Sequence, residues 1–207
     1  MKAKKAFVSL TVLLMLLHSC TSGVKENGNS QWLQGSVCQF PCWENIVPQE
    51  TLFDDVFPTL RKRGIEASID SESEISFRTK DDIDGSISKA TDGTVDLIIL
   101  WVSEQGPRLD DIVQILGSPG KIAFIPNPIH SDLPCVVRIV FPNHGTILEL
   151  YLENYGPEST CEINVNSASQ LSRILLIGSN FDKSEFWQHP SYADLDYVEW
   201  KGYGEYP

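Results

Sequence analysis

Five cysteines have the most definite chemistry in this chain, because thiols form disulfides, bind metals or carry a covalent lipid. Cys20 ends an apolar segment near the N-terminus, and the other four are Cys38, Cys42, Cys135 and Cys161. If the chain is exported, the remaining even number predicts two disulfides with three possible pairings. We favour Cys38 with Cys42, which would close a short loop, and Cys135 with Cys161, which fall on separate predicted strands.

The N-terminus has the pattern of an export signal. Lysines within residues 1–5 precede an apolar-biased stretch at 6–17, and the small Ser19 stands before Cys20. The stretch is shorter than the ~20 residues that a spanning helix needs. The pattern resembles the lipobox of bacterial lipoproteins, in which the cysteine is lipidated and becomes the new N-terminus. The alternative is an ordinary signal peptide with a coincidental cysteine, and both interpretations predict an extracytoplasmic protein.

Charge argues against nucleic acid as a partner. Cleavage before Cys20 would remove three of the 16 basic side chains and leave 13 against 28 acidic ones, a net charge of −15. Phosphate backbones need clustered Lys and Arg. The basic run at 61–63 suits the C-terminus of a predicted helix instead. Residues 20–34, rich in Gly, Ser and Asn, are interpreted as a flexible tether between lipid and domain.

Two acidic pairs could be proposed as catalytic groups. Asp54-Asp55 and Asp110-Asp111 are paired carboxylates, which perform hydrolysis when burial separates their pKa values. Both pairs, however, fall in the first turn of a predicted helix, where the helix dipole stabilises them. No nucleophile elbow, zinc-protease, P-loop or dinucleotide motif occurs. We therefore predict a protein that is not an enzyme and uses no cofactor.

Metal binding has two weak candidates. Residues 81–85 (Asp-Asp-Ile-Asp-Gly) contain a fragment of a calcium loop, but no Glu stands at the twelfth position. His130, Cys135 and His144 are the nearest set of soft ligands, and their spacing fits no zinc motif. We predict no metal site.

The last segment, residues 181–207, concentrates aromatic side chains among carboxylates. Such rings either dock on a domain or form a binding surface for proteins or sugars. We expect docking, with a short helix from Ser191 through Glu199. The members that could form a binding surface are Trp187, Tyr192, Trp200 and Tyr203.

The elements that must position these residues begin with a unit at 35–105. Thr51 can cap a helix that ends near Gly64, with Leu52, Val56 and Leu60 on one face. An internal proline at position 58 should kink this helix or end it early. Strands are predicted at 74–78 and 95–102, with a loop or weak hairpin at 79–94.

A second unit at 106–180 repeats this order. A short helix in the run that begins at Arg108 is ended by Gly117, with Pro119 just after it, and Pro142 to Gly145 form a turn. Strands are predicted at 121–125, 135–141, 146–152, 160–165 and 171–177. Both predicted helices begin with a leucine that is closely followed by two aspartates. Because of this repeat, we predict an α+β fold of tandem helix-plus-antiparallel-sheet units. Chance similarity of two amphipathic helices is the alternative.

The segment Leu116-Gly117-Ser118-Pro119 resembles the helix end of the SmpA/OmlA group of small lipoproteins. Residues 43–51 resemble the start of that group's helix, although Gln49 stands where the family has glycine. Tandem units of this kind are similar to the β-lactamase inhibitor protein, and the run from Pro41 to Pro48 resembles uncharacterised bacterial envelope lipoproteins. The resemblance implies an α+β fold and binding of other proteins without a cofactor.

Together these observations predict a bacterial lipoprotein held to a membrane through lipid on Cys20. We expect it to act as a non-catalytic interaction module whose partner is an envelope protein. The alternative is a cell-surface glycan-binding protein or hydrolase that uses the acidic and aromatic C-terminal region.

Overall fold

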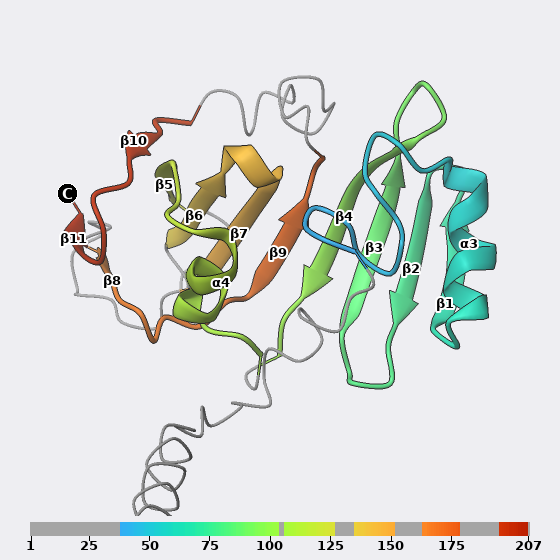
Figure 1. Cartoon of the computed structure of the whole chain (residues 1–207), viewed down its shortest axis with the longest axis horizontal. Coiled ribbons are helices and arrows are strands. Elements are labelled where there is room, and N and C mark those ends of the chain that lie inside the picture. Colours follow the sequence, from blue (N-terminus) through green and yellow to red (C-terminus); the bar gives the residue numbers. More distant parts are fainter. Residues whose placement is uncertain (1–37, 104–105, 127–134, 152–162, 179–194, 207) are drawn as a thin grey trace, which may run out of the picture.

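A computed structural model describes residues 38–103, 106–126, 135–151, 163–178 and 195–206 (Figure 1). The helices in these ranges are α3 (Phe53–Lys62), α4 (Leu109–Leu116) and the 3₁₀ turn η2 (Pro142–His144). The strands are β1 (Glu66–Ser71), β2 (Glu74–Arg78), β3 (Asp84–Lys89), β4 (Val95–Trp101), β5 (Lys121–Pro126), β6 (Cys135–Phe141), β7 (Thr146–Tyr151), β8 (Ile163–Val165), β9 (Arg173–Leu176), β10 (Val198–Glu199) and β11 (Gly204–Tyr206).

One antiparallel sheet dominates the molecule. Its nine strands lie in the order β1-β2-β3-β4-β9-β7-β6-β5-β10, and β8 and β11 form a separate two-stranded sheet. The prediction of tandem helix-plus-sheet α+β units is therefore wrong. The physical reason is the pairing of β4 with β9, in which Ile98 faces Leu176 and Trp101 faces Arg173. This pairing makes the strands of residues 66–101 and 121–176 one continuous sheet (Figure 1).

Both α-helices pack on the same face of this sheet. Phe53, Val56 and Leu60 of α3 are buried in the main core. Leu109, Ile112 and Leu116 of α4 belong to the same cluster. Apolar positions at helical spacing thus give each helix one buried side, and burial of that side is the main stabilisation of such short helices.

The other side of the sheet is the second face, defined here as the side away from α3 and α4. Its apolar centre is a separate cluster of Leu97, Val140, Ile147, Leu175 and Ile177. Strand β4 contributes to both clusters, because Ile98 and Leu100 lie in the main core. A strand buried on both faces needs apolar residues at successive positions, which explains the continuous apolar run.

Several predicted elements are confirmed. The predicted strand 74–78 coincides with β2, and the predicted strand 135–141 coincides with β6. β6 and β7 form the predicted hairpin, whose turn includes η2 and Gly145 in the left-handed conformation. The predicted second helix is α4, and it ends at Gly117 as predicted, where φ is 79°.

Other predictions need correction. The first helix has Leu52 rather than Thr51 at its N-cap, and Pro58 lies inside it. The expected loop or weak hairpin at 79–94 contains a full strand, β3, between β2 and β4. Asp, Gly and Ser are depleted in strands, so the composition of β3 hid it. Gly85 is needed there, because a Cβ atom would lie 2.0 Å from the Phe77 ring.

The helix predicted from Ser191 to Glu199 is also wrong in its described part. Val198 and Glu199 form strand β10, which pairs with Ile122 and Lys121 of β5. The start of the predicted helix lies outside the described residues. Backbone pairing with the sheet edge overrides the weak helical pattern.

Candidate functional site

A row of charged residues crosses the second face. The strand registers place Glu66 of β1 opposite Arg78 of β2, and Arg78 opposite Asp84 of β3. The row continues through Trp101 of β4 and Arg173 of β9. It ends with two residues from β7 and β6, Glu149 and Arg138. We call these seven residues the charged row. Apart from Trp101, its charges alternate in sign, so each acid faces a base across the sheet.

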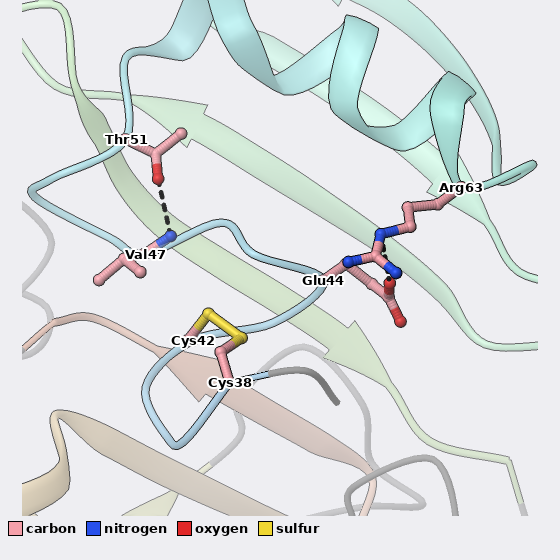
Figure 2. Close-up of a disulfide and its surroundings, with 6 residues drawn as sticks. All are labelled: Cys38, Cys42, Glu44, Val47, Thr51 and Arg63. Carbon is pink, nitrogen blue, oxygen red and sulfur yellow. Dashed lines mark hydrogen bonds and ion pairs between the residues drawn. A yellow bond between two sulfur atoms is a disulfide. The ribbon is translucent and has the colours of Figure 1, made fainter. Parts of the chain in front are cut away.

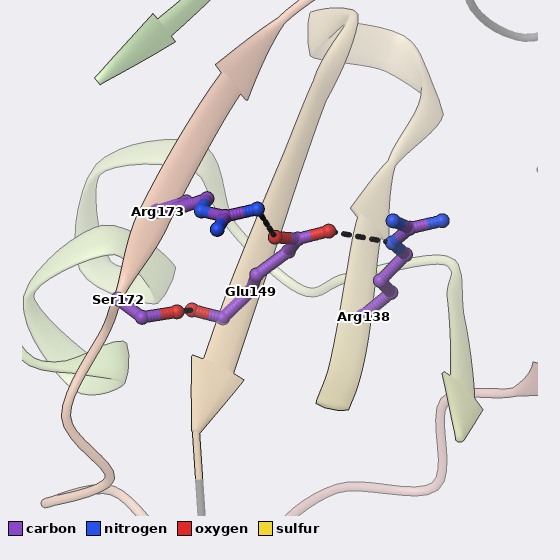
Figure 3. Close-up of polar contacts among 4 residues, drawn as sticks. All are labelled: Arg138, Glu149, Ser172 and Arg173. Atoms are coloured by element: carbon purple, nitrogen blue, oxygen red, sulfur yellow. Dashed lines mark hydrogen bonds and ion pairs between the residues drawn. The ribbon is translucent and has the colours of Figure 1, made fainter. Parts of the chain in front are cut away.

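Glu149 is at the centre of the buried end of the row (Figure 3). Its carboxylate accepts a hydrogen bond from Arg138 Nε at 2.7 Å, and Arg173 Nη1 lies 3.4 Å from its other oxygen. Only 3% of the Glu149 side chain is exposed, and the Arg173 side chain is 39% exposed. Ser172 donates to the Glu149 carbonyl through its hydroxyl at 2.9 Å. A buried carboxylate is tolerated because it bonds to two guanidinium groups.

The exposed end of the row contains a bidentate ion pair. Arg78 donates from Nε to Asp84 Oδ1 at 2.5 Å and from Nη2 to Oδ2 at 2.9 Å. The hydrogen bond from Arg78 lowers the pKa of Asp84 below its usual value. The same bond and the Asp84 charge raise the pKa of Arg78. The pair is solvated, so it orders the surface more than it stabilises the fold.

Trp101 lies between the two ends of the row. It is 38% exposed, with Asp84 on one neighbouring strand and Arg173 on the other. Tryptophan and arginine are among the residue types enriched at the positions that dominate protein interfaces. Both neighbours are ion-paired, Asp84 with Arg78 and Arg173 with Glu149, so Trp101 lies between two charged groups that already have partners.

A disulfide joins Cys38 and Cys42, with a Cα–Cα distance of 5.6 Å (Figure 2). Beside it, Arg63 Nε lies 3.6 Å from Glu44 Oε2, and Val47 N donates to the Thr51 hydroxyl at 2.8 Å. The disulfide fixes the segment that leads into α3. Cys161 lies outside the described residues, and so do Cys20 and the proposed Cys135–Cys161 pairing.

The C-terminal aromatic prediction is only partly within the described residues, since Trp187 and Tyr192 lie outside them. Tyr206 is buried, Trp200 packs against the main core, and their ring centroids are 6.0 Å apart. Tyr203 contacts Trp200 edge to face at 5.8 Å. Tyr203 is exposed, and its hydroxyl donates to Asp110 Oδ1 at 3.4 Å. Partial burial, then the Asp110 charge, raises the pKa of Tyr203.

The two acidic pairs lie in the first turns of α3 and α4. Asp111 accepts a hydrogen bond from the Arg108 backbone N–H at 2.8 Å, and Asp110 accepts one from Gln114 at 2.9 Å. Asp54 lies 3.9 Å from Lys89 Nζ. These contacts cap and pair helix ends, which is the structural role expected at that position.

Within the described ranges, no group of three His, Cys, Asp or Glu side chains is arranged to hold a metal ion. Asp84 of the calcium-loop fragment is in the ion pair with Arg78. His130 of the soft-ligand set lies outside the described residues. No described helix combines the length and apolar character needed to cross a membrane.

Comparison with known protein families, with curated proteins and with solved structures finds no match for this chain. The resemblance to the SmpA/OmlA group therefore stays a prediction.

Sequence reasoning missed the charged row, although a signal was present. Strands β6, β7 and β9 are apolar except for an isolated charge in each, at Arg138, Glu149 and Arg173. A lone charge inside a buried strand requires an opposite charge nearby, so one acid and two bases predict a cluster. Trp101 gave no such signal, because it ends an apolar run.

Proposed function

We propose that this protein is a non-catalytic interaction module of the bacterial cell envelope, held to a membrane by lipid on Cys20. Its partner is another envelope protein, bound on the second face around Trp101. The leader pattern supports the membrane address. The observation that carries the binding function is an exposed Trp101 flanked by Asp84 and Arg173 on the two neighbouring strands.

The chemistry of the row favours recognition over catalysis. Within the charged row, the hydrogen bond from Arg78 lowers the pKa of Asp84. A general acid needs a raised pKa instead. Ion-paired carboxylates and guanidinium groups present fixed donors and acceptors, which confer specificity on a protein interface.

Chemical crosslinking on intact membranes followed by capture of the full chain tests the proposal. Trp101→Ala should reduce the recovered partner by more than about tenfold, because central tryptophans contribute ~2 kcal/mol or more to an interface. Tyr203→Ala is the matched control, since Tyr203 is an exposed aromatic that bonds to Asp110 of α4, away from the second face. Equal recovery with both variants would contradict the proposal, provided that each unfolds at the wild-type midpoint.

A further inference from the structure

Strand β1 forms one end of the nine-stranded sheet and pairs only with β2 among the described residues. Five of its six residues are exposed, and Ile69 is 62% exposed. An edge strand presents a row of backbone N–H and C=O groups to any extended chain beside it. In contrast, the strand at the opposite end, β10, has only two residues.

The charged side chains of β1 and of its turn to β2 are all acidic, whereas the neighbouring helix α3 ends in the basic residues Arg61 and Lys62. Glu66, Asp70, Glu72 and Glu74 lie within nine residues, and no Lys or Arg occurs from 66 to 77. The nearest base in sequence after them, Arg78, is in the ion pair with Asp84. Glu66 faces Arg78 across the sheet, whereas Asp70, Glu72 and Glu74 give the rest of this exposed edge a net negative charge.

The two faces of β1 present different side chains to an added strand. Ala67 and Ile69 face Phe77 and Ile75 across the β1–β2 pair, and those two residues belong to the main core. Ser68 and Asp70 lie on the second face, where Asp70 accepts hydrogen bonds from Ser68 and Ser76. An added strand thus meets an exposed isoleucine on one side and a carboxylate on the other.

We infer that the β1 edge binds an extended segment of another protein in which basic and apolar residues alternate. The basic residues lie beside Asp70 on the second face, and an apolar residue packs on Ile69. The segment adds a tenth strand, with main-chain hydrogen bonds supplying affinity and alternate side chains supplying specificity. A second copy of this chain fits poorly, because antiparallel β1–β1 pairing brings carboxylates of both copies together.

This site is separate from the one in the proposed function. Trp101 lies on the fourth strand of the sheet, about 14 Å from β1 at ordinary strand spacing. Loss of binding at one site leaves the other intact, so the two proposals fail independently.

The test is fluorescence anisotropy of the full chain with a labelled hexapeptide of alternating Lys and Val. We expect saturable binding, together with slowed amide exchange within Glu66–Ser71. Ile69→Lys should weaken binding by roughly tenfold or more, a loss of ~1.4 kcal/mol. Ile115→Lys is the matched control, since Ile115 is an exposed isoleucine on α4, and it should bind the peptide as the wild type does.

A fully N-methylated peptide of the same sequence keeps the charges and cannot donate backbone hydrogen bonds. Strand addition predicts that it does not bind. Equal binding of both peptides, or equal weakening by Ile69→Lys and Ile115→Lys, would overturn the inference. Peptide-independent dimerisation that Ile69→Lys abolishes would assign the edge to a second copy and overturn it as well.

Discussion

Glu149 connects the two arginines at the buried end of the charged row, and only 3% of its side chain is exposed. Glu149→Gln removes the negative charge that faces both guanidinium groups. Breaking a buried ion pair from one side costs about 3–5 kcal/mol. We expect the free energy of unfolding to fall by about that amount, as measured by urea denaturation.

The control for this prediction is the solvated pair in the same row. Asp84→Asn removes the carboxylate that is bonded to Arg78. Because the side chains of Asp84 and Arg78 are both largely exposed, the shift in the urea midpoint should be small. If Glu149→Gln shifts the midpoint no more than Asp84→Asn, the buried cluster does not stabilise the sheet.

Tyr203 predicts a pH dependence at the alkaline end. Its pKa is raised above the usual 10.0 by burial and by Asp110. The folded state therefore favours the neutral ring. This contribution is fully present below pH ~10, and it is lost as the pH rises through the folded-state value.

Thermal unfolding between pH 8 and 12 measures this effect. The wild type should lose stability more steeply above pH ~10 than Tyr203→Phe, which has no ionisable hydroxyl. Identical slopes would show that Tyr203 ionises equally in the folded and unfolded chains.

At the scale of elements, the β6–β7 hairpin meets the end of β9 through two glycines. A Cβ atom on Gly145 would lie 1.9 Å from the Gly178 carbonyl oxygen, and Gly145 has a φ of 53°. Gly145→Ala combines overpacking with a strained backbone, so we expect a loss of about 3 kcal/mol. Thermal or urea unfolding measures it.

Gly93→Ala separates the two causes. Gly93 also has a positive φ, 90°, but nothing lies within 4 Å of its Cβ position. It should lose only the conformational part, about 1 kcal/mol. Equal losses for the two variants would mean that the approach of Gly145 to Gly178 has no energetic consequence.

The disulfide loop is the second element with a measurable contribution. The two bridged cysteines are four positions apart, so the bridge closes a short loop. Chain entropy gives roughly 2 kcal/mol of stabilisation for a loop of this length. The double variant Cys38→Ser with Cys42→Ser should lower the free energy of unfolding by that amount. A reductant should lower the unfolding midpoint of the wild type more than that of the double variant, which lacks this bridge. An unchanged stability in the double variant would contradict the prediction.

Local signals determined which elements could be read from the sequence. Turn residues around Gly145 and the stop at Gly117 located the β6–β7 hairpin and α4. Strand β3 was not predicted, because Asp84, Gly85 and Ser86 give its start a low strand propensity. These residues are in a strand because they pair with β2 on one side and with β4 on the other. Tertiary pairing likewise made β10 from residues 198–199, which had been expected to be helical.

At the scale of the whole molecule, repetition in the sequence led to the wrong architecture. The similar helix starts at Asp54 and Asp110 suggested two units, and both helices exist. The pairing of β4 with β9 links residues about 75 apart in sequence, and no local pattern encodes a contact of that separation. The charged row depends on the same pairing, since it places Trp101 beside Arg173.

Lipid anchoring through Cys20 can be tested on the whole chain. We expect metabolic labelling with a radioactive fatty acid to label the wild type, and the protein to sediment with membranes. Cys20→Ala should lose the label and enter the soluble fraction. A labelled or membrane-bound Cys20→Ala protein would contradict lipid anchoring at this cysteine.

The central claim is that the second face around Trp101 contacts another envelope protein. Its most direct measurement is photocrosslinking in intact cells, with a photoreactive phenylalanine analogue in place of Trp101 and, separately, in place of Tyr203. We expect one discrete crosslinked protein from position 101 and none of that size from position 203. A pattern that is the same at both positions, or no product at position 101, would contradict it.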